Sequence, residues 1–378
     1  MHLNATEEFH YGSELQGRGE MSTFDTAVGL FVTLLSMAAV SVGLLNLCII
    51  KEMTIFHSAF GCLWISRTIG EIGANIIHVI YSGPVTILQP KDISPTFGIV
   101  AFTIGYFFAC ESCVMHQYIS ANRMFAVCTP LKYKSIFTKR VTTIIIVITW
   151  VEVAIIMALY HVIPCSMIGY SPKFYEYVFI KCTPDIDRDY SIVGTLTNRG
   201  CFVMCIFSLV CDFVTFSKII HVKLTNHGSA QDAAFKRNVR FFAQTAVQNI
   251  SMYGTLVAVV MVNNSTASGQ TASYIIAFNA LIASHLNNGL ALIIFNPEVH
   301  KFLGLQVLHI GSLVLAHNMV AESEVDVEDR QRDRSVFAED KWCRVVATAL
   351  LVLNVLVVLA VFYQIERVFG GHVRHNRQ

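Results

Sequence analysis

Long apolar runs alternate along this chain with short polar segments. A helix of about 20 apolar residues crosses a hydrocarbon core of about 30 Å. Seven runs reach or exceed that length, and they occupy residues 27–50, 57–81, 97–127, 141–163, 191–220, 241–262 and 271–295. We therefore predict an all-α membrane protein built as a seven-transmembrane helix bundle.

The composition supports a membrane class and excludes several others. Hydrophobic residues make up 54% of the 378 residues and charged residues only 14%, whereas soluble chains carry about 25% charged residues. The net charge of +1 and the lack of a basic helix argue against a nucleic-acid partner. The 11 cysteines show no paired metal-ligand spacing, so we expect neither a metal nor a cofactor.

Charge in the loops predicts the orientation. The segments after the third and fifth runs are basic, whereas those after the second, fourth and sixth are neutral or mildly acidic. The positive-inside rule then places the N-terminus outside the cell. Glycosylation sequons at Asn4, Asn263 and Asn264 fall on that same side, which is an independent agreement.

The apolar pattern also divides the chain. We predict an extracellular N-terminal tail (1–26), a seven-span domain (27–305), a polar charged linker (306–342) and an additional apolar helix with a short tail (343–378). The last segment reads equally well as a working eighth span or as an error of gene assembly.

The end of the third run carries the most distinctive motif. It reads Asn122-Arg123-Met124, and a basic loop containing Pro130 follows. This resembles the third helix and second intracellular loop of rhodopsin-like G-protein-coupled receptors, although the acid before the arginine and the aromatic after it are missing. The strings around Arg123, Phe60-Gly61, Gln244 with Gln248, and Phe295-Asn296-Pro297-Glu298 together resemble the nematode serpentine receptor class X family of chemoreceptors.

The resemblance implies a chemosensory G-protein-coupled receptor in the plasma or ciliary membrane. Such a receptor binds a small-molecule ligand on its extracellular side and meets a heterotrimeric G-protein with its cytoplasmic loops, while its helices contact the lipid bilayer. The alternative is a membrane transporter or channel, but no internal repeat favours it. No clustered catalytic constellation supports an enzyme.

The same resemblance assigns switch residues at the inner side. These are Asn122, Arg123, Pro130, Leu131, Lys132, Tyr133, Asn296 and Pro297. Each has a plainer explanation. Arg123 could be an arginine that reaches the water interface, the basic loop could serve membrane topology alone, and the helix could simply stop at Pro297.

The rise of a helix suggests ligand contacts. At about 1.5 Å per residue, positions 15 to 21 residues before Arg123 lie about 22 to 32 Å toward the outside. The candidates there are Phe102, Thr103, Tyr106 and Phe107. Glu111, nearer mid-membrane, could contact ligand, join an internal polar network or simply pack.

Two further pairs stand out. Cys165 and Cys182 bracket an outer loop, so they form either an intra-loop disulfide or two free thiols. Arg67 and Glu71 lie four residues apart on one helix face, so they can neutralise each other as a structural pair or act in switching.

Overall fold

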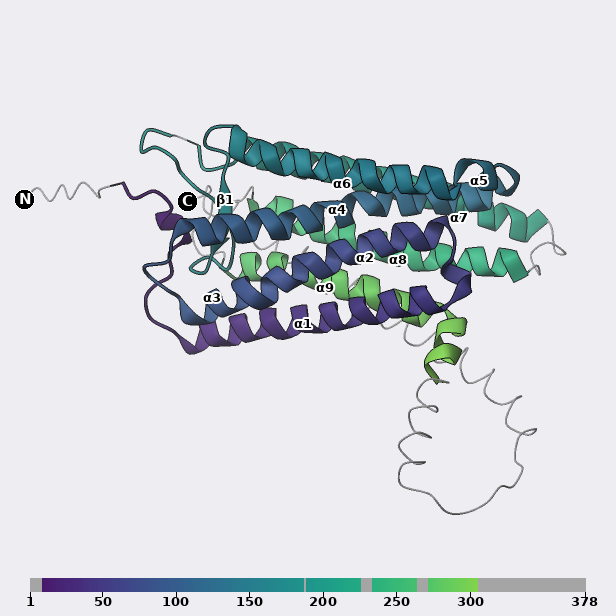
Figure 1. Ribbon diagram of the computed structural model, residues 1–378, viewed down its shortest axis with the longest axis horizontal. Helices are drawn as coiled ribbons and strands as arrows, with labels where there is room; N and C mark the ends of the chain where they lie inside the picture. Colours follow the sequence, from purple (N-terminus) through teal and green to yellow (C-terminus); the bar gives the residue numbers. More distant parts are fainter. Residues whose placement is uncertain (1–8, 187, 226–232, 264–270, 305–378) are drawn as a thin grey trace, which may run out of the picture.

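The computed structural model describes residues 9–186, 188–225, 233–263 and 271–304. Long helices lie side by side in an elongated bundle (Figure 1). They are α1 (Thr23–Glu52), α2 (Ala59–Ile77), α4 (Pro95–Cys128), α6 (Lys139–Val162), α7 (Ile192–Thr225), α8 (Ala233–Asn263) and α9 (Thr271–Phe295). Each matches one predicted span, which confirms the all-α seven-helix architecture.

Within the described residues, five of these helices are long and apolar enough to cross a membrane alone: α1, α4, α6, α7 and α9. The other two carry more polar character. α2 buries Arg67 and Glu71, and α8 begins with the basic residues Lys236, Arg237 and Arg240. Both pack against apolar helices: α2 against α1 and α4, and α8 against α7 and α9.

Short elements gather at the two ends of the bundle (Figure 1). One end holds the 3-10 turn η1 (Ser13–Leu15), the π-helical turn η3 (His78–Ser82), α3 (Gly83–Leu88) and an antiparallel hairpin of β1 (Ile168–Ser171) and β2 (Glu176–Phe179). The other end holds η2 (Thr54–Phe56) and α5 (Pro130–Ile136). We call these the outer end and the inner end.

The structure corrects three loop predictions. Part of the polar segment between the second and third apolar runs (82–96) is the helix α3, because Pro84 sits in its first turn, where no backbone N–H is needed. Pro130 starts α5 in the same way, inside the predicted basic loop. The polar segment 164–190 contains the hairpin, whose strands are rich in aromatic and β-branched residues.

Close helix packing fixes the frame. A side chain at Gly43 of α1 would come within 2.7 Å of Ile72 in α2, so only glycine permits this approach. At the inner end, Phe56, Phe60, Trp64 and Phe241 share one buried cluster.

Beyond α9, residues 297–304 are helical. The predicted linker and C-terminal helix, as well as Asn4 and Asn264, lie outside the described residues.

Candidate functional site

A cavity of about 140 Å³ opens near the outer end. Five long helices (α4, α6, α7, α8 and α9) and the hairpin supply most of its wall. The aromatic and polar side chains that line it include His78, Phe102, Tyr106, Tyr160, Glu176, Tyr177, Asn198, Tyr274 and Phe278. Most of this wall is aromatic, which is typical of a small-molecule site.

Phe102 of α4 organises the aromatic wall. Its ring stacks on Tyr106 with centroids 4.9 Å apart and meets the edges of Tyr160 at 5.3 Å and Tyr177 at 5.1 Å. Tyr177 in turn lies 5.7 Å from Phe278 of α9. Side chains from α4, α6, α9 and β2 therefore form one continuous aromatic surface, each pair in a favourable tilted, edge-on or stacked geometry.

Polar groups are few in this wall. The Tyr106 hydroxyl donates to Asn198 Oδ1 at 2.8 Å. Glu176 of β2 contributes the only acidic side chain that lines the cavity within the described residues. Burial raises the pKa of Glu176 to about 8, because desolvation penalises the carboxylate.

A disulfide closes the base of the hairpin that carries Glu176. Cys165, just before β1, and Cys182, just after β2, are joined in the structure with their Cα atoms 5.3 Å apart. The register pairs Ile168 with Phe179 at one end and Ser171 with Glu176 at the other. Covalent closure on one side and the β-ladder on the other therefore limit how far Glu176 can move.

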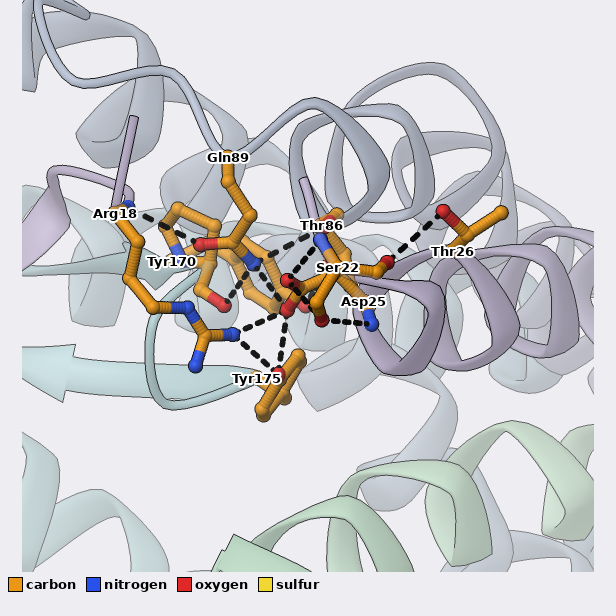
Figure 2. A network of polar contacts seen from close by, with 9 residues as sticks. Arg18, Ser22, Asp25, Thr26, Thr86, Gln89, Tyr170 and Tyr175 are labelled. Carbon is orange, nitrogen blue, oxygen red and sulfur yellow. Dashed lines mark hydrogen bonds and ion pairs between the residues drawn. The ribbon is translucent and has the colours of Figure 1, made fainter. Parts of the chain in front are cut away.

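A polar cluster, which we call the cap, holds the turn of the hairpin (Figure 2). Figure 2 shows Arg18, Tyr175 and Gln89 converging on the carboxylate of Asp25. Arg18 forms an ion pair with Asp25 and donates a hydrogen bond to Tyr175, and Gln89 donates to Asp25 Oδ1 at 3.0 Å. Gln89 also donates to the backbone carbonyl of Pro172 at 2.8 Å, which ties α3 to the hairpin turn.

The sequence builds the cap from local signals. Ser22 and Asp25 form a reciprocal capping box at the start of α1, which fixes the Asp25 carboxylate at the helix N-terminus. Burial alone would lower the pKa of Arg18, but the hydrogen bond to Tyr175 and the charge of Asp25 raise it. Arg18 therefore stays a cation, and the N-terminal segment, α1, α3 and the hairpin are held together next to the cavity.

A central polar network crosses the middle of the bundle. Arg67 Nε lies 3.3 Å from Glu71 Oε1, and its NH1 donates to Gln248 of α8 at 3.1 Å. Asn288 of α9 donates to Glu71 Oε1 at 2.6 Å. Glu71 therefore supplies the acceptor and Asn288 the donor in a contact that joins α2 to α9.

The network continues toward α7. The His116 ring links two amide side chains. Its Nδ1 lies 2.9 Å from Asn249 Oδ1, and its Nε2 lies 3.3 Å from Asn288 Nδ2. Asn249 then donates to Asp212 Oδ2 at 2.7 Å and to Ser120 Oγ at 2.6 Å. One chain of contacts therefore joins α2, α4, α7, α8 and α9.

Arg123 is packed inside the inner end rather than at the water interface. Only 4% of its surface is exposed. Its guanidinium lies 4.0 Å from the centre of the Phe60 ring in α2 and 5.5 Å from that of Phe241 in α8. It donates to Asn122 Oδ1 at 2.5 Å. The plain explanation of an arginine that reaches out to water is wrong for this structure, because aromatic faces hold the cation.

The neighbouring switch residues divide into buried and exposed groups. Asn122 is fully buried and exchanges hydrogen bonds with the Tyr133 hydroxyl, which anchors α5 to α4. Leu131 is 94% exposed on α5, and Lys132 beside it is exposed as well. Buried anchors thus present an exposed apolar residue at the inner surface.

Asn296 and Pro297 lie at the end of α9. Asn296 donates to Gln244 of α8 at 2.9 Å and to the carbonyl of Leu292 at 2.6 Å. The second bond adds a side-chain donor to a carbonyl in the last turn of α9, just before Pro297, which has no N–H to donate. The motif therefore joins α9 to α8 besides ending the helix.

The predicted ligand residues separate in space. Phe102 and Tyr106 line the cavity, whereas Thr103, Phe107 and Glu111 do not. Thr103 hydrogen-bonds the backbone of its own helix and lies 3.1 Å from His161 Nε2. The ring of Phe107 packs on Trp150, and Glu111 accepts a hydrogen bond from Ser66 at 2.5 Å. Glu111 thus makes a polar contact inside the bundle, which matches the internal polar network among the three alternatives.

Sequence reasoning missed Glu176, Tyr177 and Phe278. The alternating Tyr175-Glu176-Tyr177 in an otherwise polar loop was the signal for a strand that could bring a carboxylate and a ring to the bundle. Phe60 belonged to a recognised motif, but its contact with Arg123 depends on the packing of two helices that sequence does not give.

Comparison with known proteins gives three findings. The model of the family described as "Serpentine type 7TM GPCR chemoreceptor Srx" matches residues 34–296. The chain is 21% identical over 274 residues to serpentine receptor class X 45 of Caenorhabditis elegans, a match that covers 67% of this chain and 74% of that protein. The fold is similar to the crystal structure of squid rhodopsin with a TM-score of 0.61 at 11% identity, covering 82% of this chain and 90% of the rhodopsin.

Proposed function

Because the chain belongs to the Srx family of serpentine seven-transmembrane chemoreceptors, we propose that it is a chemosensory G-protein-coupled receptor. The family match confirms the resemblance drawn from the short motifs, and family and fold are those of a receptor in the membrane, not of an enzyme. In our proposal a small molecule binds in the outer cavity, and a heterotrimeric G-protein binds at the inner end.

One observation carries the proposal: α4 belongs to both sites. Phe102 and Tyr106 line the cavity, and Arg123 on the same helix holds α2 and α8 at the inner end. The 17 residues from Tyr106 to Arg123 span about 25 Å of helix. A shift or rotation of α4 on ligand binding would therefore change the packing of Arg123. In this proposal α4 is the element with two positions through which the outer site acts on the inner end.

The central polar network supports the same coupling. It joins α4 at His116 to α8 at Asn249 and α9 at Asn288, midway between the two sites. Buried polar networks adopt discrete arrangements because each unsatisfied group costs about 1–3 kcal/mol. A change at the cavity would be passed on as a switch of hydrogen-bond partners rather than as a gradual deformation.

The inner surface offers a docking site for the G-protein. Leu131 projects from α5 into solvent, and the exposed basic residue Lys132 lies beside it. We propose that Pro130, Leu131, Lys132 and Tyr133 form the coupling loop, with Asn122 and Arg123 behind it and Asn296-Pro297 across from it.

The loop charges support an orientation, and the family supports a location. We propose an extracellular N-terminus in the plasma or ciliary membrane, with glycans at Asn4, Asn263 and Asn264, and residues 27–305 as the receptor domain. The Cys165–Cys182 disulfide fits an oxidising exterior.

The test measures coupling and topology in the same cells. The full chain carries an N-terminal epitope tag, and the recruitment of engineered G-protein α-subunits of each class is followed with and without a small-molecule library. Arg123→Ala should abolish recruitment at equal surface expression, and the control Arg140→Ala, at an exposed arginine nearby, should retain it.

The N-terminal epitope also tests the proposed orientation. An epitope accessible on intact cells and an Asn4→Gln variant that loses a glycan would support the proposed orientation. An epitope that becomes accessible only after permeabilisation would overturn both the orientation and the receptor proposal.

A further inference from the structure

We propose that the outer cavity binds a small organic cation, a primary or quaternary ammonium, with Glu176 as its counter-ion and the surrounding aromatic rings as its walls. This inference rests on the proposed function, because it takes the outer cavity as the ligand site and adds the chemical class of the ligand.

The first argument is an unbalanced carboxylate. Within the described residues, no side chain donates a hydrogen bond to Glu176 and none of the three ion pairs includes it. No lysine or arginine lines the cavity there either. A partly buried carboxylate without a partner is costly, so a site that keeps one is suited to a ligand that supplies the positive charge.

The second argument is the aromatic wall. Cations are attracted to the faces of aromatic rings within about 6 Å, and cages of such rings recognise quaternary ammonium groups. Phe102, Tyr106, Tyr160, Tyr177 and Phe278 surround the cavity in one connected set. Tyr177 is next to Glu176 in β2, so the charge and the ring faces come from the same strand.

The third argument is size. A cavity of about 140 Å³ is close to an engineered cavity of about 150 Å³ in another protein that binds benzene. The ligand should therefore be about the size of a single aromatic ring or of a compact tetraalkyl group.

The cap and the disulfide explain why Glu176 can serve as a fixed counter-ion. Tyr175, the preceding residue, is 1% exposed and bound to Arg18 and Asp25, and Cys182 closes the other end of β2. Asp25 meets its own cation in Arg18, which leaves Glu176 as the carboxylate available to the cavity. A preorganised counter-ion loses little freedom when the ligand binds.

The experiment uses three ring compounds of nearly equal size that differ in charge: benzylammonium, benzyl alcohol and benzoate. Tetramethylammonium and phenethylammonium widen the range of cations. Binding to the purified full-length receptor in lipid nanodiscs is measured by thermal shift and by saturation-transfer NMR, neither of which depends on a G-protein.

We expect wild type to bind at least one of the ammonium probes at millimolar concentration and to prefer benzylammonium over benzyl alcohol and benzoate. Glu176→Gln should weaken ammonium binding by about 30-fold or more, since one partner of a buried charge pair is lost. Glu176→Asp should recover part of it. The matched control is Asp185→Asn, at an exposed carboxylate of the same outer segment, which should bind like wild type.

A second variant tests the rings independently of the charge. Tyr177→Phe keeps the ring face and should retain binding, whereas Tyr177→Leu should lose it. The proposal is overturned if benzyl alcohol or benzoate binds as well as benzylammonium, if Glu176→Gln keeps the preference for the cation, or if none of the three ammonium probes binds wild type. Binding without G-protein recruitment would contradict the proposed function and leave this inference standing.

Discussion

The guanidinium of Arg123 lies 4.0 Å from the centre of the Phe60 ring, so a charge at the end of α4 is stacked on an aromatic residue of α2. The receptor superfamily places an acid before this arginine, and here the position holds Asn122. The aromatic face replaces the missing carboxylate as the partner of the cation. Because Phe241 of α8 lies 5.5 Å from the same charge, movement of α8 would loosen the arrangement.

Replacing Phe60 should therefore favour the active state. A cation–π contact contributes about 0.5–2 kcal/mol, so Phe60→Leu should raise ligand-independent G-protein recruitment by roughly 2- to 30-fold. Recruitment of engineered G-protein α-subunits, normalised to surface expression, measures the effect.

The control is Phe56→Leu. Phe56 belongs to the same buried cluster and packs on Phe241 at 5.9 Å, but no cation of the described residues lies over its ring. It should lose stability as Phe60→Leu does without gaining basal recruitment. Equal gains in the two variants would mean that loosened core packing, rather than the cation–π contact, sets the resting state.

Replacing only one residue of the Arg67–Glu71 pair should destabilise the fold more than replacing both. Both are buried, with Nε and Oε1 3.3 Å apart. Glu71→Gln would leave the Arg67 charge uncompensated in the bundle and should cost about 3–5 kcal/mol of stability. Arg67→Met combined with Glu71→Leu should recover most of it. The melting temperature in detergent and the surface fraction in cells report both changes.

This comparison also separates the two explanations of the pair. A double variant that folds and still recruits a G-protein would show a purely structural pair. A double variant that folds but does not recruit would assign the pair to switching.

The sequence predicted the helices because their hydrophobic runs are long and because membrane insertion forces backbone hydrogen bonds to be made within each segment. The pairing of Arg67 with Glu71 was predictable for a related reason, since polar groups in lipid must find partners inside the bundle, and the same rule applies to Asn46. In the structure, Asn46 donates to the carbonyl of Gly289 at 3.0 Å.

The outer site was predicted only in part. Helical rise placed Phe102 and Tyr106 at the depth of the cavity, but depth does not tell which face of α4 points inward, so Thr103 and Phe107 were chosen with them. Glu176 depends on a hairpin that folds back over the bundle, and that fold is set by contacts such as Gln89 with Pro172, which are 83 residues apart.

The Cys165–Cys182 disulfide should stabilise the hairpin against opening. Its sequence separation is 17, and closing a loop of that size contributes about 3 kcal/mol in the chain-entropy model. Replacing both cysteines with serine should lower the melting temperature and make the 165–182 segment more sensitive to protease. Cys62→Ser, at an exposed free cysteine, is the control and should leave both unchanged. Equal protease sensitivity of all three proteins would contradict a stabilising role.

Binding of a permanent cation should depend on pH through Glu176. Burial raises the pKa of this carboxyl to about 8, so below that pH the empty site is mostly protonated and neutral. A quaternary ammonium needs the ionised form, and its binding releases the proton. Affinity for tetramethylammonium should therefore rise about tenfold per pH unit from pH 6 to 8 and become constant above, because one proton is released per cation bound.

Other titratable groups surround the same carboxyl, and variants distinguish them. They are His78, Tyr106, Tyr160, Tyr177 and Tyr274 in the lining and Asp189, whose charge acts on Tyr274. Since tetramethylammonium itself does not titrate, any change of its affinity with pH must come from a group on the protein. His78→Gln should keep the slope, and Glu176→Gln should bind weakly and equally at every pH. A slope that survives in Glu176→Gln and disappears in His78→Gln would assign the titration to the histidine, and Glu176 would no longer explain how pH acts on the outer cavity.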